Sequence, residues 1–212
     1  MVKASQSHDI IVFGATGFTG RLAALKLATQ PGIKLAIAGR SRAKLEALAD
    51  QCLHRPAIVE ADASDKNSIL AMVQQGRVIA NFAGPFALYG ESVIAACSEL
   101  GRDYCDITGE TPFIREMIDR YEAKAEETGA CLIPMSGFDS VPADMLSYLA
   151  LGEGDRHGWA LNNLTHYYQM KGGFNGGTLL SAITMGEQKK NHLVADSNIL
   201  ISHPKWNRNS RL

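Results

Sequence analysis

The chain has 212 residues, of which 46% are hydrophobic and 20% are charged, and its formal net charge is −1. These values are typical of a soluble globular protein, and a net charge near zero gives no electrostatic basis for binding nucleic acid. No apolar run approaches the roughly 20 residues that span a bilayer, which excludes a transmembrane segment but leaves peripheral membrane contact open.

The first predicted element is an apolar strand, Ile10–Phe13, that leads directly into a glycine-rich turn and a helix. In such a turn the glycines allow a tight bend, a close approach of backbone N–H groups to a pyrophosphate, and close packing of the helix on the sheet. The helix N-terminus adds unpaired N–H groups and a partial positive charge. The alternative is a glycine-rich turn without a ligand. We predict a dinucleotide-binding loop that includes Gly14, Thr16, Gly17, Phe18, Thr19 and Gly20.

Short apolar runs alternate with amphipathic helical patterns through residues 9–150. The runs are nearly continuous in apolar residues, as expected for parallel strands that are covered on both faces. The clearest helix begins at Thr111-Pro112, a pair that suits the N-cap and the first helical position, and Gly129 closes it. Six β/α units in this order predict an α/β fold, a doubly wound parallel sheet of the Rossmann type. The predicted strands are 10–13, 34–38, 57–60, 78–82, 104–107 and 131–134.

The pattern changes after about residue 150, where Gly152, Gly154 and Gly158 loosen the chain. Only one strand, over 162–171, and one helix, over 178–189, are predicted there. So few elements cannot easily close a second hydrophobic core. We therefore expect an NAD(P)-binding domain over 1–150, and over 151–212 the beginning of a truncated α+β substrate or dimerisation domain. The alternative is an irregular C-terminal extension that folds back on the first domain.

The end of the second strand indicates which nucleotide binds. NAD-selective folds usually place an acidic residue there, about 20 residues past the glycine loop, to bond the ribose 2′-hydroxyl. Here Arg40 and Arg42 can pair with a 2′-phosphate, and Ser41 can donate a hydrogen bond to it. This predicts a preference for NADP(H) over NAD(H), unless the arginines simply start a solvated helix. Asp62, after the third strand, is placed to meet the adenine amino group or to lie at a helix N-terminus.

The fourth strand continues into a turn that we expect to face the nicotinamide half of the cofactor, because ligands of open α/β sheets bind beyond the carboxyl ends of the strands. Asn81 would fix an amide or a ribose hydroxyl, or would only satisfy local main chain. The predicted cofactor contacts from this segment are Asn81, Ala83, Gly84 and Pro85.

Two later strand ends, 103–110 and 136–144, concentrate polar residues at the same edge. A proton donor is needed only where the product gains a proton, since the cofactor carries the hydride. Asp106 would alternatively make a structural bond to a neighbouring loop, and Asp139 and Ser140 would alternatively cap the next helix. The candidate catalytic residues are Tyr104, Asp106, Glu110 and Asp139.

Other classes of catalytic site find no support. The sequence lacks a His-Glu-x-x-His metal helix and a Gly-x-Ser-x-Gly elbow, and its four cysteines are widely spaced without a Cys-x-x-Cys pair. With no signal peptide, reduced thiols in a cytoplasmic protein without a metal site are expected.

In these motifs the chain resembles the saccharopine dehydrogenase-like oxidoreductases, in the branch that includes bacterial trans-acting enoyl reductases. The resemblance implies a nicotinamide-nucleotide-binding domain followed by a smaller substrate domain that normally continues beyond this chain's end. It also leaves a homodimer open if the second domain were complete. The matching segments are GATGFTGR at 14–21, LAIAGRSRAKL at 35–45, NFAGPFALYGE at 81–91, DYCDITGE at 103–110, SGFDSVPAD at 136–144 and GGFNGGT at 172–178.

The resemblance implies an NADPH-dependent oxidoreductase. Saccharopine-type enzymes act on a polar amino-acid imine and need cationic groups, and no arginine is placed for that in the strand-end motifs. Enoyl reductases act on acyl chains, which the apolar surroundings of Phe86, Leu88, Tyr89 and Phe138 would tolerate. This favours reduction of an enoyl or related acyl substrate. The alternatives are a saccharopine dehydrogenase-like enzyme and a non-catalytic NADP-binding fragment or sensor.

Overall fold

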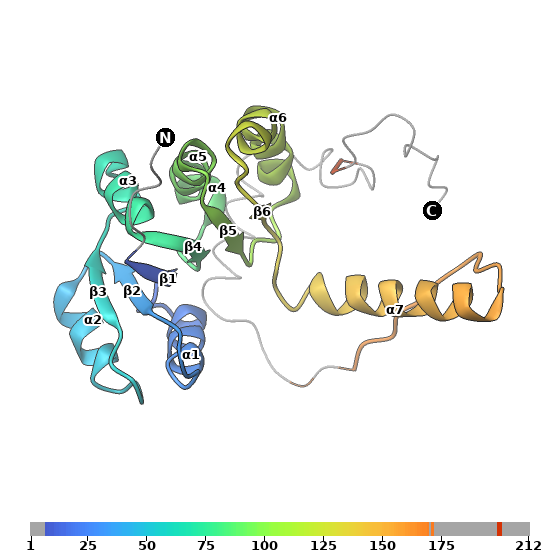
Figure 1. Ribbon diagram of the computed structural model, residues 1–212, viewed down its shortest axis with the longest axis horizontal. Coiled ribbons are helices and arrows are strands. Elements are labelled where there is room, and N and C mark those ends of the chain that lie inside the picture. The colour runs from blue at the N-terminus through green and yellow to red at the C-terminus, as the bar shows by residue number, and fades with distance from the viewer. Residues whose placement is uncertain (1–6, 170, 172–198, 201–212) are drawn as a thin grey trace.

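The computed structural model describes residues 7–169, 171 and 199–200, and their fold is of the predicted α/β class (Figure 1). Six parallel strands form one sheet in the order β3-β2-β1-β4-β5-β6. All six predicted strands are confirmed, with ends that differ by at most two residues. The strands are His8–Phe13 (β1), Leu35–Gly39 (β2), Ala57–Glu60 (β3), Gly76–Asn81 (β4), Asp103–Asp106 (β5) and Leu132–Ile133 (β6).

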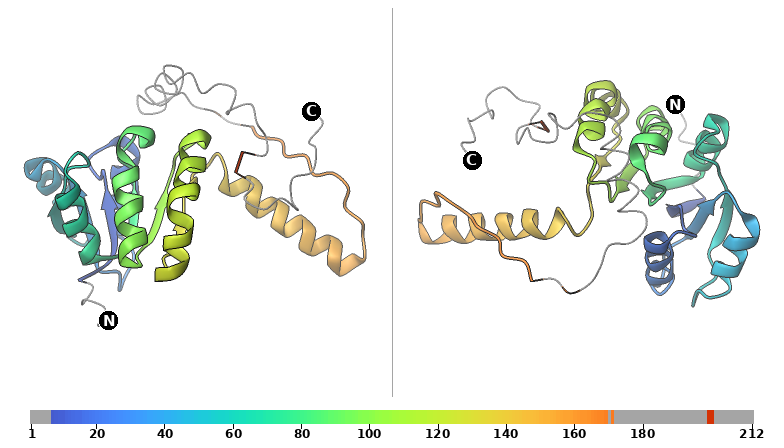
Figure 2. Two further views of the ribbon diagram at one scale, coloured as in Figure 1. Left: turned by 90° about the horizontal axis from the view of Figure 1, so that it is seen from above. Right: turned by 180° about the vertical axis from the view of Figure 1, so that it is seen from behind.

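Helices cover both faces of the sheet, as the apolar character of the strands requires (Figures 1 and 2). α1 and α2 pack on one face, whereas α3, α5 and α6 pack on the other. The helices are Phe18–Leu27 (α1), Arg42–Ala49 (α2), Lys66–Gln75 (α3), Phe86–Tyr89 (α4), Glu91–Leu100 (α5), Thr111–Thr128 (α6) and Val141–His157 (α7).

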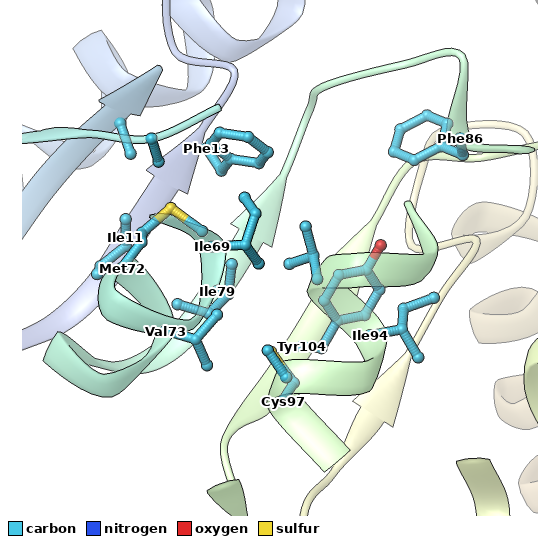
Figure 3. Close-up of a cluster of buried hydrophobic side chains, with 14 of the residues drawn as sticks. Ile11, Phe13, Ile69, Met72, Val73, Ile79, Phe86, Ile94, Cys97 and Tyr104 are labelled. Atoms are coloured by element: carbon cyan, nitrogen blue, oxygen red, sulfur yellow. The ribbon is translucent and has the colours of Figure 1, made fainter. Parts of the chain in front are cut away.

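The two-residue period of the strands divides the apolar side chains between two cores. On β1, Ile11 and Phe13 join the cluster beneath α3, α5 and α6, whereas Val12 faces α1 and α2. Figure 3 shows the first cluster, in which Tyr104 lies beside Ile94 and Cys97 of α5. Both clusters are fully buried around the central strands, so the sheet is a rigid support for the loops at its carboxyl edge.

The helix ends largely follow the sequence signals. Gly101 and Gly129 end α5 and α6 in the left-handed conformation, with φ of 61° and 74°. The N-cap of α6 is Glu110 rather than Thr111, so the predicted start is one residue late.

Two expectations for the later part of the chain are wrong. Gly152 and Gly154 lie inside α7 and do not loosen it, since a glycine costs a helix only about 1 kcal/mol. Residues 162–169 and 171 form no strand. Instead this segment returns alongside α7, where His166 Nε2 lies 3.1 Å from Ser147 Oγ. α7 extends away from the sheet and passes through residue 150, where we expected the domain boundary (Figure 2). The helix over 178–189 falls outside the described residues.

A pair of matched glycine substitutions tests the packing of α1 on the sheet. A Cβ at Gly20 would lie 2.4 Å from the carbonyl oxygen of Gly14, whereas a Cβ at Gly152 would meet nothing within 4 Å. We expect Gly20→Ala to lower the free energy of unfolding by about 1–3 kcal/mol or more. Gly152→Ala is expected not to lower it, because alanine is the better helix former. Urea denaturation of both variants measures the difference, and equal stabilities would contradict the packing described.

Candidate functional site

A crevice is expected where the strand order reverses, between the loops that follow β1 and β4. Phe13 pairs with Asn81 at the ends of these strands, and the backbone N–H of Phe82 donates to the carbonyl oxygen of Phe13. Gly14 then turns away with a φ of +75°. A Cβ at Gly14 would lie 2.7 Å from the backbone nitrogen of Ala83, so no other residue fits this approach. The predicted loop segments 14–20 and 81–85 therefore lie side by side.

The glycine loop has the features that hold a pyrophosphate. Gly17 is the N-cap of α1, no side chain caps this helix, and its first turn contains no acidic residue. Thr16 and Phe18 are exposed, and Thr19 is half-buried. An uncapped helix N-terminus without nearby carboxylates favours an anion.

The two arginines that follow β2 differ in their surroundings. Arg40 is exposed, and Ser41 is the N-cap of α2 without a side-chain cap bond. Arg42 starts α2, as the alternative interpretation held, and forms ion pairs with Glu60 at 3.2 Å and Glu46 at 3.0 Å. Hydrogen bonds to Glu60 and then Glu46 raise the pKa of Arg42. Sequence reasoning missed Glu60, a strand-end carboxylate that meets Arg42 only because β3 pairs with β2.

Asp62 lies at the same edge but does not cap a helix. The N-cap of α3 is Asp65, whose side chain accepts a hydrogen bond from the Asn67 backbone. The Asp62 carboxylate accepts from the backbone N–H and the hydroxyl of Ser64, at 2.9 and 2.8 Å. These bonds lower the pKa of Asp62, and the nearby Arg40 contributes in the same direction.

Asn81, predicted to meet the cofactor, is fully buried. Its Oδ1 accepts a hydrogen bond from the backbone N–H of Ala83 at 2.9 Å, and its Nδ2 donates to the Tyr104 hydroxyl at 3.2 Å. The amide therefore satisfies local main chain, which was the alternative interpretation. It supports the turn that includes Ala83, Gly84 and Pro85, in which the Gly84–Pro85 peptide bond is cis.

Tyr104 and Asp106 are also covered by protein. The Tyr104 hydroxyl donates to Asp106 Oδ2 at 2.7 Å, and burial is the main cause of a pKa well above that of free tyrosine. Asp106 Oδ1 accepts from the backbone N–H groups of Thr108 and Met135, at 3.0 and 2.9 Å. Burial raises the pKa of Asp106 against the opposing effect of these hydrogen bonds. Asp106 thus makes a structural hydrogen bond to a neighbouring loop, which is the alternative role that the sequence analysis gave it.

Glu110 and Asp139 differ sharply in exposure. Glu110 is buried, and its carboxylate accepts from the backbone N–H groups of Phe86 and Ala87, at 3.1 and 2.7 Å. Asp139 is exposed in the loop before α7. Ser140 is the N-cap of α7, but its side chain makes no cap bond. Of the four candidate proton donors, Asp139 alone is open to a substrate.

Other kinds of site receive no support from residues 7–169, 171 and 199–200. No group of three or more His, Cys, Asp or Glu side chains there could hold a metal ion. Within the same described residues, no helix is both long and apolar enough to cross a bilayer. A cavity of about 390 Å³ between α5, α6 and β6 contains no residue of the glycine loop, so it is separate from the crevice.

Comparison with known proteins identifies the family of the chain. Residues 10–133 match the saccharopine dehydrogenase NADP binding domain. A Mycobacterium tuberculosis protein named as a candidate trans-acting enoyl reductase is 40% identical over 192 residues, covering 86% of this chain and 45% of the relative. A trans-acting enoyl reductase of Mycobacterium bovis is 40% identical over 153 residues, covering 70% of this chain and 36% of the relative. The chain thus spans less than half the length of these relatives.

The solved structure of apo saccharopine dehydrogenase (L-Glu forming) from Saccharomyces cerevisiae shares the fold. Its TM-score is 0.60 at 18% sequence identity, and the match covers 71% of this chain and 32% of that one. The glycine loop, the sheet order and the family match agree over the same residues. The chain therefore belongs to the saccharopine dehydrogenase-like family, and it carries that family's NADP-binding domain.

Proposed function

We propose that this chain provides the cofactor-binding part of an NADPH-dependent oxidoreductase that reduces an enoyl or related acyl substrate. The observation that carries the proposal is the approach of Gly14 to the backbone of Ala83 at the switch point of the sheet. The names of the relatives supply the reaction class, since one is called a trans-acting enoyl reductase and the other a candidate for that activity. The bound cofactor would supply the hydride, and the protein would position it.

The residues at the carboxyl edge fit a dinucleotide. The pyrophosphate would lie against the N-terminus of α1, where Gly17 is the N-cap and no side chain caps the helix. Arg40 would provide the principal contact to a 2′-phosphate, because Arg42 already pairs with two carboxylates. Asp62 would lie near the adenine, and the 83–85 turn beside the nicotinamide.

Apolar side chains near the strand ends favour an acyl substrate over a polar imine. Leu88 and Phe138 are 58% and 61% exposed, and Tyr89 is also exposed. Phe86 belongs to the buried core at 6% exposure, so it would not contact the substrate directly. Exposed apolar side chains near a cofactor site provide a surface that an acyl chain can cover.

The proton for the second carbon would come from Asp139 or from water. Asp139 is exposed and shares its loop with Phe138. Tyr104, Asp106 and Glu110 are enclosed by their hydrogen-bond partners, so we assign them to positioning instead.

Nucleotide preference can be tested by removing one arginine. Arg40→Ala should weaken NADPH binding about tenfold and leave NADH binding unchanged, because only NADPH carries the 2′-phosphate. The control is Arg77→Ala, which removes an exposed arginine at the N-terminal end of β4, at the edge of the sheet away from Arg40. NADPH fluorescence titration gives the affinities. An equal loss for both nucleotides would place Arg40 outside the phosphate site.

The reaction can be tested on the chain continued by the C-terminal remainder of its M. tuberculosis relative. We expect NADPH oxidation with an enoyl thioester, and Asp139→Asn should reduce kcat about a hundredfold without changing NADPH affinity. Asp144→Asn, in the first turn of α7, is the matched control. NADPH binding without turnover would favour the sensor function. Full activity of Asp139→Asn would leave water as the proton source.

A further inference from the structure

The polar side chains at the ends of β4 and β5 form one continuous hydrogen-bonded path. The path starts at the backbone N–H of Ala83 and passes through Asn81 and the Tyr104 hydroxyl to Asp106. Figure 3 shows Tyr104 beneath the strand ends, with its hydroxyl directed toward the end of the sheet where Phe86 lies. The first half of the path therefore links the turn after β4 to the end of β5.

The second half returns to the segment from which the path started. Asp106 Oδ1 accepts from the backbone of Thr108, whose hydroxyl accepts from the Glu110 backbone at 3.1 Å. The Glu110 carboxylate accepts from the backbones of Phe86 and Ala87. Both ends of the segment 83–87 are therefore held by the same set of side chains, and the path closes on itself.

Asp106 also connects this path to the loop that follows β6. Its Oδ1 accepts from the Met135 backbone, and its own carbonyl oxygen accepts from the Ser136 backbone at 2.7 Å. Met135 has a φ of +58°, a backbone conformation that needs support from its surroundings. One aspartate thus fixes the start of the loop that carries Asp139.

The side chains of the path are buried. Its five side-chain members, Asn81, Tyr104, Asp106, Thr108 and Glu110, are each at most 4% exposed. Buried polar groups that are mutually hydrogen-bonded have one preferred arrangement, and losing one partner leaves another without compensation. A path of this kind fixes the backbone at its two ends more firmly than the turn could fix itself.

We propose that this closed path is a positioning device for hydride transfer, with Tyr104 as its central link. It holds the main chain of residues 83–85 in a fixed position beside the nicotinamide half of the cofactor. Through Asp106 it also fixes the position of the loop that carries Asp139 relative to residues 83–85. The proposal rests on the proposed function, since it needs the nicotinamide to lie beside this turn. It assigns no chemistry to Tyr104 itself.

The proposal predicts that a change in the path affects the nicotinamide half of the cofactor and leaves the adenosine half unaffected. Tyr104→Phe keeps the ring in the core and removes the hydroxyl, so Asn81 Nδ2 and Asp106 Oδ2 lose their shared partner. The turn at Ala83 should loosen, whereas Arg40 and Asp62 follow β2 and β3 and should keep their positions. Nicotinamide contacts should weaken while contacts to the adenine and the 2′-phosphate remain.

Two probes measured on the 212-residue chain test this separation. NADPH contains the nicotinamide, whereas 2′,5′-ADP is adenosine with a 2′-phosphate and a 5′-phosphate and has no nicotinamide. We expect Tyr104→Phe to weaken NADPH binding about tenfold and to leave 2′,5′-ADP binding unchanged. Tyr121→Phe is the matched control, because the hydroxyl of Tyr121 on α6 donates an exposed hydrogen bond to Glu91 on α5. This variant should change neither affinity.

Each other outcome is decisive. Unchanged NADPH affinity in Tyr104→Phe, or an equal loss for both probes in a folded variant, would overturn the proposal. If Tyr104→Phe does not fold, Glu110→Gln tests the other end of the path. Its amide cannot accept from both Phe86 and Ala87, and the same split between probes is expected. If neither variant folds, the path is a folding element and the proposal is rejected. A wild-type chain that binds neither probe would instead overturn the proposed function.

Discussion

The site depends on one close approach of two backbones. β1 and β4 are neighbours in the sheet, and the chain leaving each strand must pass the other without a side chain between them. Gly14 meets this constraint, since a Cβ there would lie 2.7 Å from Ala83 N. Gly20 in turn packs on Gly14, which brings the N-terminus of α1 over the same point. The N-terminus of α1 and the turn after β4 are therefore set together by these two close approaches.

Much of the fold could be predicted because its signals are local. The apolar runs predicted the six strands, and glycines in the left-handed conformation end α5 and α6. The strand expected over 162–171 failed because a strand needs a partner to satisfy its backbone. α7 satisfies its own hydrogen bonds within the helix, so it continued through Gly152 and Gly154.

The roles of the polar strand-end residues could not be predicted in the same way. Tyr104, Asp106 and Glu110 are of types that catalyse proton transfer, but only Asp106 ends β5 and Glu110 follows it, whereas Tyr104 lies inside the strand. Whether each side chain points into the crevice or beneath it depends on partners 23 to 29 residues away in the chain, such as Asn81, Phe86 and Met135. The contacts between these distant parts of the chain could not be predicted from the sequence alone. The buried polar residues hold the turn after β4, and we propose that the exposed residues at the same edge of the sheet contact the ligand.

The most direct test of this account is to record backbone amide NMR spectra of the chain while NADPH is added. The account predicts the largest chemical-shift changes at Gly17, Phe18 and Ala83, with small changes at Arg77 on the opposite edge of the sheet. These positions belong to two separate loops, which meet where Gly14 approaches Ala83. Changes confined to another surface, such as the cavity between α5, α6 and β6, would contradict the assignment of the crevice as the cofactor site.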